Sequence, residues 1–144
     1  MTTCYARGFN DLRVYQKARE VCRTVFRLSK SFPKEEMYSL TDQVRRSTRS
    51  IGAQIAEAWG KRRYERHFVS KLTDADAEQM ETQHWVSEAL DCGYISTADA
   101  TQLNSGIEEI GRMLNSMTEK ADSFCGSLDG VLREDTTEYF TADH

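Results

Sequence analysis

Apolar residues recur every three or four positions along four stretches of this chain, and that spacing predicts four amphipathic helices. The first is expected at about residues 10–31 and the second at about 39–60. The third is expected at about 64–92 and the fourth at about 96–124. Alternating apolar and polar runs of the kind found in strands are scarce, and the chain has a single proline. The expected fold class is therefore all-α.

The connections between the expected helices are short, which favours antiparallel neighbours and an up-down-up-down four-helix bundle. Pro33 disfavours helical geometry in the residue before it and so separates the first two helices. Ser96, followed three residues later by Asp99, resembles a capping box at the start of the fourth helix. We expect one bundle domain over residues 1–125, followed by a flexible, disordered acidic tail over residues 126–144.

Two polar residues interrupt the apolar stripe of the third expected helix. Gln79 and Thr82 occupy positions where leucine is expected. Leu72 before them and Val86 after them keep the apolar pattern. The sequence alone does not explain the two polar positions.

Charge is distributed unevenly along the chain. The formal net charge is −4, and residues 126–144 alone carry five acidic residues against one arginine. Sixteen of the 19 Lys and Arg residues lie between residues 7 and 71, and none lies between Lys71 and Arg112. The first two helices are thus expected to be basic and the last two acidic.

Two groups of basic side chains on the first two helices are candidate nucleic-acid-binding residues, since Lys and Arg neutralise phosphates. The antiparallel turn is expected to gather the first group near one end of the bundle, with the second group at the opposite end. The alternative is that both are solvated faces paired with acidic residues of the third helix. The first group is Arg19, Arg23, Arg27, Lys30, Arg45, Arg46 and Arg49, and the second is Lys61, Arg62, Arg63 and Arg66.

Small residues on the second expected helix indicate a candidate subunit contact. Gly52, Ala53 and Ala56 permit another helix to approach closely. We therefore interpret these three residues as an oligomer contact.

No catalytic constellation is recognisable. Glu81 and His84 have the Glu-x-x-His spacing of di-metal bundles, but neither His67 nor His144 supplies a second such pair. A pairing of Cys92 with His84 lacks a third orienting group. No Gly-rich phosphate loop, nucleophile elbow or HExxH motif occurs. We expect no catalytic residue, no metal and no cofactor, and hence a protein that is not an enzyme.

The cysteines and the hydropathy pattern indicate a cytoplasmic protein. The four cysteines are far apart and include no CxxC pair, which argues against zinc and against a disulfide framework. No stretch approaches the ~20 apolar residues that a membrane-spanning helix needs. An apolar signal core is also missing at the N-terminus, so no membrane partner is expected.

Several short motifs occur in an order that is specific when taken together. They are Phe9-x-x-Leu12-x-x-Tyr15-x-Lys17-Ala18, Phe32-Pro33-x-Glu35, Leu40-x-x-Gln43-x-Arg45-Arg46, Phe68-x-x-x-Leu72 and Gly93-Tyr94-Ile95. Over about residues 9–120 the chain resembles the four-helix-bundle proteins encoded within bacterial large-subunit (23S) rRNA intervening sequences. Relatives of that family include the accessory variability protein of diversity-generating retroelements.

The resemblance implies a homo-oligomer, typically a pentameric ring, with a suspected role in RNA or DNA biology. Together with the basic first half, it leads to our main hypothesis: a non-enzymatic, homo-oligomeric bundle that binds nucleic acid. RNA or an RNA–protein complex is the expected ligand, and the basic residues of the first two helices the expected contacts. The alternative is a protein-interaction scaffold or an accessory subunit, for example of a reverse transcriptase, without direct nucleic-acid binding.

Overall fold

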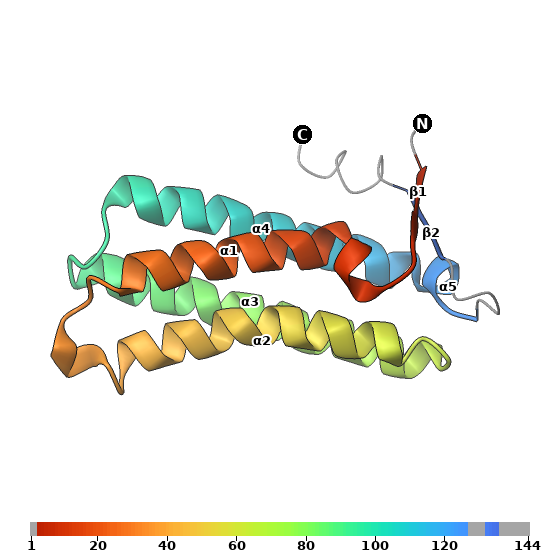
Figure 1. Ribbon diagram of the computed structural model, residues 1–144, viewed down its shortest axis with the longest axis horizontal. Helices are drawn as coiled ribbons and strands as arrows, with labels where there is room; N and C mark the ends of the chain where they lie inside the picture. The colour runs from red at the N-terminus through yellow and green to blue at the C-terminus, as the bar shows by residue number, and fades with distance from the viewer. Residues whose placement is uncertain (1–2, 127–131, 136–144) are drawn as a thin grey trace.

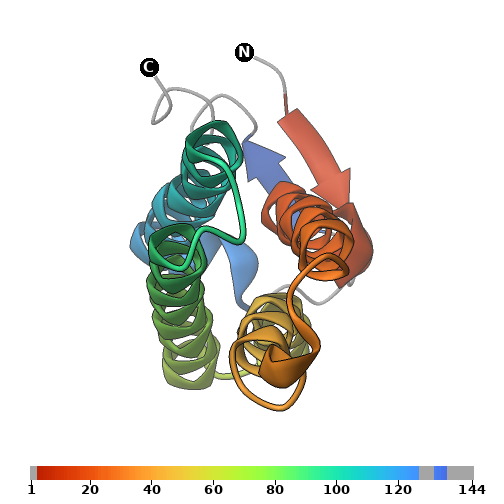
Figure 2. The ribbon, with the colours of Figure 1, turned by 90° about the vertical axis from the view of Figure 1, so that its left-hand side faces the viewer.

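Four long helices form an antiparallel bundle in the computed structural model, which describes residues 3–126 and 132–135 (Figure 1). They are α1 (Arg13–Ser29), α2 (Leu40–Gly60), α3 (Glu65–Asp91) and α4 (Thr97–Glu119). Viewed along the bundle, each helix lies beside the next in the chain, and α4 returns to lie beside α1 (Figure 2). The predicted all-α class and up-down-up-down bundle are confirmed.

Short elements complete the chain around the four helices. They are strand β1 (Thr3–Ala6), 3-10 helices η1 (Phe9–Asp11) and η2 (Lys34–Glu36), helix α5 (Ala121–Phe124) and strand β2 (Leu132–Asp135). The 3-10 turn precedes α1, which therefore begins a few residues later than the apolar spacing indicates.

One hydrophobic core runs through the bundle, and all four apolar stripes contribute to it. Val14 and Ile51 are fully buried on α1 and α2, and Leu72 and Ile107 are buried on α3 and α4. The Ser96 hydroxyl accepts a hydrogen bond from the Asp99 backbone N–H at 3.0 Å, so the capping interaction expected for the fourth helix is present.

The two loops at one end of the bundle are joined by aromatic and polar contacts. The rings of Phe32 and Tyr94 lie 5.4 Å apart, and the Tyr94 hydroxyl donates to the Glu36 carboxylate at 2.8 Å. That hydrogen bond, reinforced by desolvation, raises the pKa of Tyr94 to about 12. Gly93 ends α3 with φ of +76°, a conformation that favours glycine. These contacts show why the Phe32 and Gly93 motifs, far apart in sequence, occur together.

A two-stranded ribbon is the main feature that was not expected from the sequence. β1 pairs antiparallel with β2, so that Thr3 lies opposite Asp135 and Ala6 opposite Leu132. Residues 132–135 belong to the stretch expected to be a disordered tail. The rest of that tail, at 127–131 and 136–144, lies outside the described residues.

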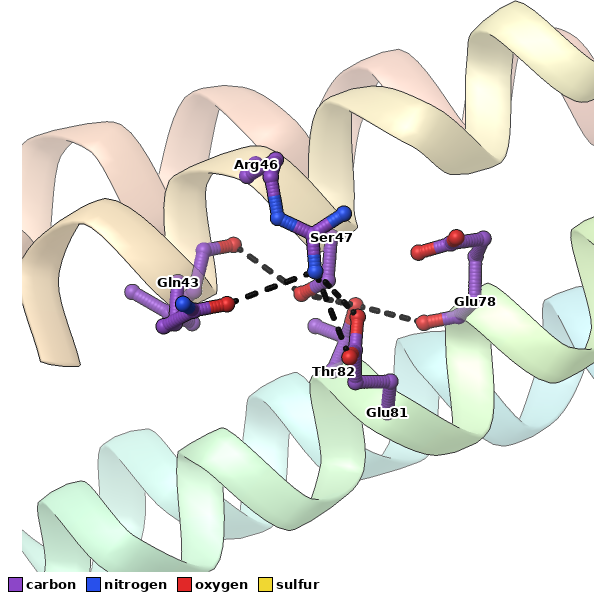
Figure 3. Close-up of polar contacts among 7 residues, drawn as sticks. Gln43, Arg46, Ser47, Glu78, Glu81 and Thr82 are labelled. Carbon is purple, nitrogen blue, oxygen red and sulfur yellow. Dashed lines mark hydrogen bonds and ion pairs between the residues drawn. The ribbon is translucent and has the colours of Figure 1, made fainter. Parts of the chain in front are cut away.

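The polar positions in the stripe of α3 have partners. The Thr82 hydroxyl oxygen lies 2.9 Å from that of Ser47 on α2, and both side chains are fully buried (Figure 3). Gln79 donates to the Asp76 carboxylate at 2.9 Å and accepts from Gln83 at 2.7 Å. Gly111 of α4 leaves room for it, because a Cβ there would lie 3.0 Å from the Gln79 Nε2.

Candidate nucleic-acid interface

Basic side chains gather along the neighbouring outer surfaces of α1 and α2. All are exposed except Arg45, which is half-buried. We call this surface the α1–α2 face, and it consists of Arg19, Arg23, Phe26, Arg27, Lys30, Arg45 and Arg49.

An exposed aromatic ring lies among these cations. Phe26 is 40% exposed, and the Lys30 ammonium lies 4.9 Å from its ring centroid. The guanidinium carbons of Arg45 and Arg49 lie 4.8 Å and 5.9 Å from the same centroid. All three distances are in the range of cation–π attraction. Phe26 was not among the residues predicted from the sequence; the pattern that marks it is a large apolar residue on the charged side of an amphipathic helix.

The cations of the α1–α2 face are not neutralised by the acidic helices. Among residues 6–126, no carboxylate forms an ion pair with any Lys or Arg of this face. The carboxylates of α3 and α4 pair elsewhere: Lys17 with Glu109 at 3.3 Å and Lys71 with Asp74 at 3.8 Å. The alternative interpretation, a solvated face paired with α3, does not describe these six side chains.

Arg46 is separated from the other six basic residues of its group. Its guanidinium reaches α3 and pairs with the Glu81 carboxylate at 3.1 Å, and it also bonds the Gln43 side chain at 3.3 Å (Figure 3). Desolvation raises the pKa of the neighbouring Glu78, and the charge of Glu81 adds to the shift while Arg46 opposes it. Arg46 thus joins α2 to α3 and stabilises the charges of Glu78 and Glu81.

A groove of about 330 Å³ runs between α1 and α2, with Arg19 and Arg49 on its wall. Its lining includes the three residues predicted to be an oligomer contact. Gly52 is buried, and a Cβ there would lie 3.5 Å from the Tyr15 ring. Ala53 is exposed and Ala56 half-buried, so both are open to a second molecule.

The second basic group surrounds the connection between α2 and α3. Lys61, Arg63 and Arg66 are exposed. Arg62 instead lies 3.6 Å above the Trp59 ring and donates through Nε to the Trp59 carbonyl oxygen at 2.7 Å. Burial lowers the pKa of the Arg62 guanidinium. This arginine packs the end of α2 and leaves the other three basic residues open to solvent.

The Glu81 and His84 pair is not arranged as a metal site. Glu81 binds Arg46, and His84 lies 3.7 Å from Glu88. Within the described residues, His, Cys, Asp and Glu side chains form no group of three that could hold a metal ion. In the same part of the chain, no helix is long and apolar enough to cross a membrane.

The four antiparallel helices place this chain in the class of small four-helix-bundle proteins. The family model of the 23S rRNA-intervening sequence protein matches residues 10–116, and the chain belongs to this family. The resemblance seen in the sequence motifs is therefore confirmed for the family.

A solved structure has the same fold. It is a protein of unknown function from the S23 ribosomal protein family of Bacteroides thetaiotaomicron. It is 28% identical to this chain, with a TM-score of 0.67 over 74% of this chain and 98% of its own. No curated protein matches the chain.

Proposed function

We propose that this protein is a non-enzymatic, homo-oligomeric bundle that binds nucleic acid through the α1–α2 face. The observation that carries the proposal is the set of six cations that no described carboxylate neutralises. Like charges on adjacent helices repel one another, and a polyanion relieves that repulsion. The name of the family points to RNA as the first ligand to test, alone or in an RNA–protein complex.

Binding of this kind positions the protein on phosphates without reading sequence. Lys and Arg displace condensed counterions, so the logarithm of affinity falls linearly with the logarithm of salt concentration. The exposed Lys61, Arg63 and Arg66 at the far end extend the same mode of contact along a longer ligand.

The groove between α1 and α2 supports the oligomeric part of the proposal. Exposed Ala53 and half-buried Ala56 give its lining small, apolar side chains against which a helix of a second copy can pack. The pentameric ring expected from the resemblance is one closed form of such an assembly.

The test of nucleic-acid binding uses fluorescence anisotropy of a labelled structured RNA and a duplex DNA at two salt concentrations. Arg23→Gln with Arg49→Gln should weaken binding at least tenfold at low salt and reduce the salt slope by about two. The matched control, Arg112→Gln on α4 with Lys120→Gln directly after it, makes the same change in charge and should alter affinity much less. Unchanged affinity in the first variant would reject the α1–α2 face.

The test of oligomerisation is light scattering after size-exclusion chromatography. Ala53→Arg places a long, charged side chain in the groove and should reduce the particle mass while helicity stays unchanged. A variant that retains the wild-type mass would remove this groove from the subunit contact.

The groove also suits the alternative function of a protein-interaction scaffold or accessory subunit, for example of a reverse transcriptase. Nuclease treatment separates the two functions. A folded oligomer that binds neither RNA nor DNA at low salt, yet retains one defined protein partner after nuclease, would favour the scaffold.

A further inference from the structure

Packing in the bundle core does not explain the position of Phe26. It follows the buried Val25 on α1 and projects from the α1–α2 face with 40% of its surface exposed. Full burial of such a ring contributes about 1.5–3 kcal/mol in other proteins, much of which an exposed position forgoes. The three cations described above lie within 6 Å of its ring centroid, and two of them come from α2.

The three cations are held differently. Arg45 is fixed, because its Nε donates to the Ser29 hydroxyl at 2.8 Å. The side chains of Lys30 and Arg49 form no hydrogen bond or ion pair with any described residue, and their contact with the ring is their only specific interaction there. Lys30 and Arg49 can therefore move away from the ring without breaking a hydrogen bond or an ion pair to a described residue, whereas Arg45 stays in place.

We infer that Phe26 is a stacking platform for an unpaired base of a single-stranded nucleic acid, with Lys30 and Arg49 moving onto the flanking phosphates. This inference rests on the proposed function and specifies that the nucleic acid is single-stranded where it meets Phe26. An aromatic ring beside backbone-binding cations is the combination by which proteins bind single strands without sequence preference. Bases of a duplex are already stacked on their neighbours, so a ring on a helix surface cannot reach them.

The experiment compares Phe26→Leu with wild-type protein on three labelled probes: a single-stranded RNA, the same strand in a duplex, and an equally long strand without bases. Phe26→Leu should weaken binding of the single strand roughly 5- to 150-fold, the equivalent of one base stack. Duplex and base-free strands should bind both proteins equally. Phe26→Tyr retains the ring and should keep wild-type affinity.

Tyr38→Leu is the matched control, because Tyr38 is 90% exposed and lies outside the α1–α2 face. It should leave all three affinities unchanged. The stacking platform would be overturned if wild type and Phe26→Leu bound the single strand with equal affinity, or if Phe26→Leu lost as much affinity for the duplex as for the single strand. Salt-dependent binding in either case would still support the proposed function. Failure of wild-type protein to bind any probe at low salt would overturn both.

Discussion

The Thr82 hydroxyl of α3 and the Ser47 hydroxyl of α2 lie 2.9 Å apart in the fully buried interface between the two helices. Each also lies near a carbonyl oxygen of its own helix: Thr82 is 2.8 Å from that of Glu78, and Ser47 is 3.3 Å from that of Val44. Both hydroxyl protons therefore have an acceptor. A polar pair replaces apolar packing here without leaving either group unsatisfied.

Replacement of Thr82 with valine keeps the side-chain shape and removes its hydroxyl. We expect Thr82→Val to lower the free energy of unfolding by about 1 kcal/mol, since Ser47 retains its own carbonyl acceptor. Urea denaturation of Thr82→Val, Ser47→Ala and the double variant measures the coupling. Additive losses in the double variant would show that the two hydroxyls do not interact.

Gly111 is expected to resist a substitution that usually stabilises helices. Glycine to alanine inside a helix gains ~0.5–1 kcal/mol of backbone propensity. A Cβ at Gly111 would meet Gln79, whose amide is fixed by Asp76 and Gln83, so Gly111→Ala should give no gain or a loss.

Gly60 at the end of α2 is the matched control for Gly111, because an added Cβ there meets nothing within 4 Å. Gly60→Ala should raise the thermal midpoint relative to wild type, and Gly111→Ala should not. An equal rise in both variants would mean that Gln79 repacks freely.

The stability of the folded protein at alkaline pH should depend on ionisation of the Tyr94 hydroxyl. Its pKa is raised to about 12 by the hydrogen bond to Glu36, so the folded protein favours the neutral phenol. This contribution is present in full below pH ~10, the ordinary tyrosine pKa, and is lost as pH rises towards 12.

The comparison that tests Tyr94 is the difference in stability between wild type and Tyr94→Phe from pH 9 to 12. The wild-type advantage should shrink across this interval, because phenylalanine has no titrating hydroxyl. A constant difference over the whole interval would show that the hydrogen bond to Glu36 does not favour the neutral form.

Glu78 should destabilise the native protein at neutral pH. Desolvation and the nearby charge of Glu81 raise its pKa, so the native state favours the protonated acid. Its stabilising contribution is present below the ordinary carboxyl pKa and is lost as pH rises through the folded pKa.

Glu78→Gln should therefore stabilise the protein at pH 7 by a few tenths of a kcal/mol, since Glu78 is only partly buried and solvent screens the effect. The gain should disappear in chemical denaturation at pH 4. Exposed Glu108→Gln on α4 is the control and should change little at either pH. A gain of the same size at pH 4 would contradict the electrostatic origin.

The sequence by itself determined the four helices, their order and the face that each buries. Helical spacing of apolar residues is a local signal, and short connections limit how neighbouring helices can run. The basic first half is also visible in the sequence, because it depends only on where Lys and Arg occur. The ribbon of β1 and β2 was not predictable in this way, because it joins the two ends of the chain and has no local period.

Only the tertiary structure decided which cations remain unneutralised and which polar residues are satisfied. Arg46 and Arg49 lie one turn apart on α2, yet Arg46 faces α3 and meets Glu81, while Arg49 faces α1, which presents no carboxylate to it. Likewise, the polar side chain of Thr82 in the apolar stripe of α3 is explained only by the Ser47 hydroxyl that lies opposite it on α2. The physical reason is that ion pairs and buried hydrogen bonds depend on distances between helices, which a sequence period does not contain.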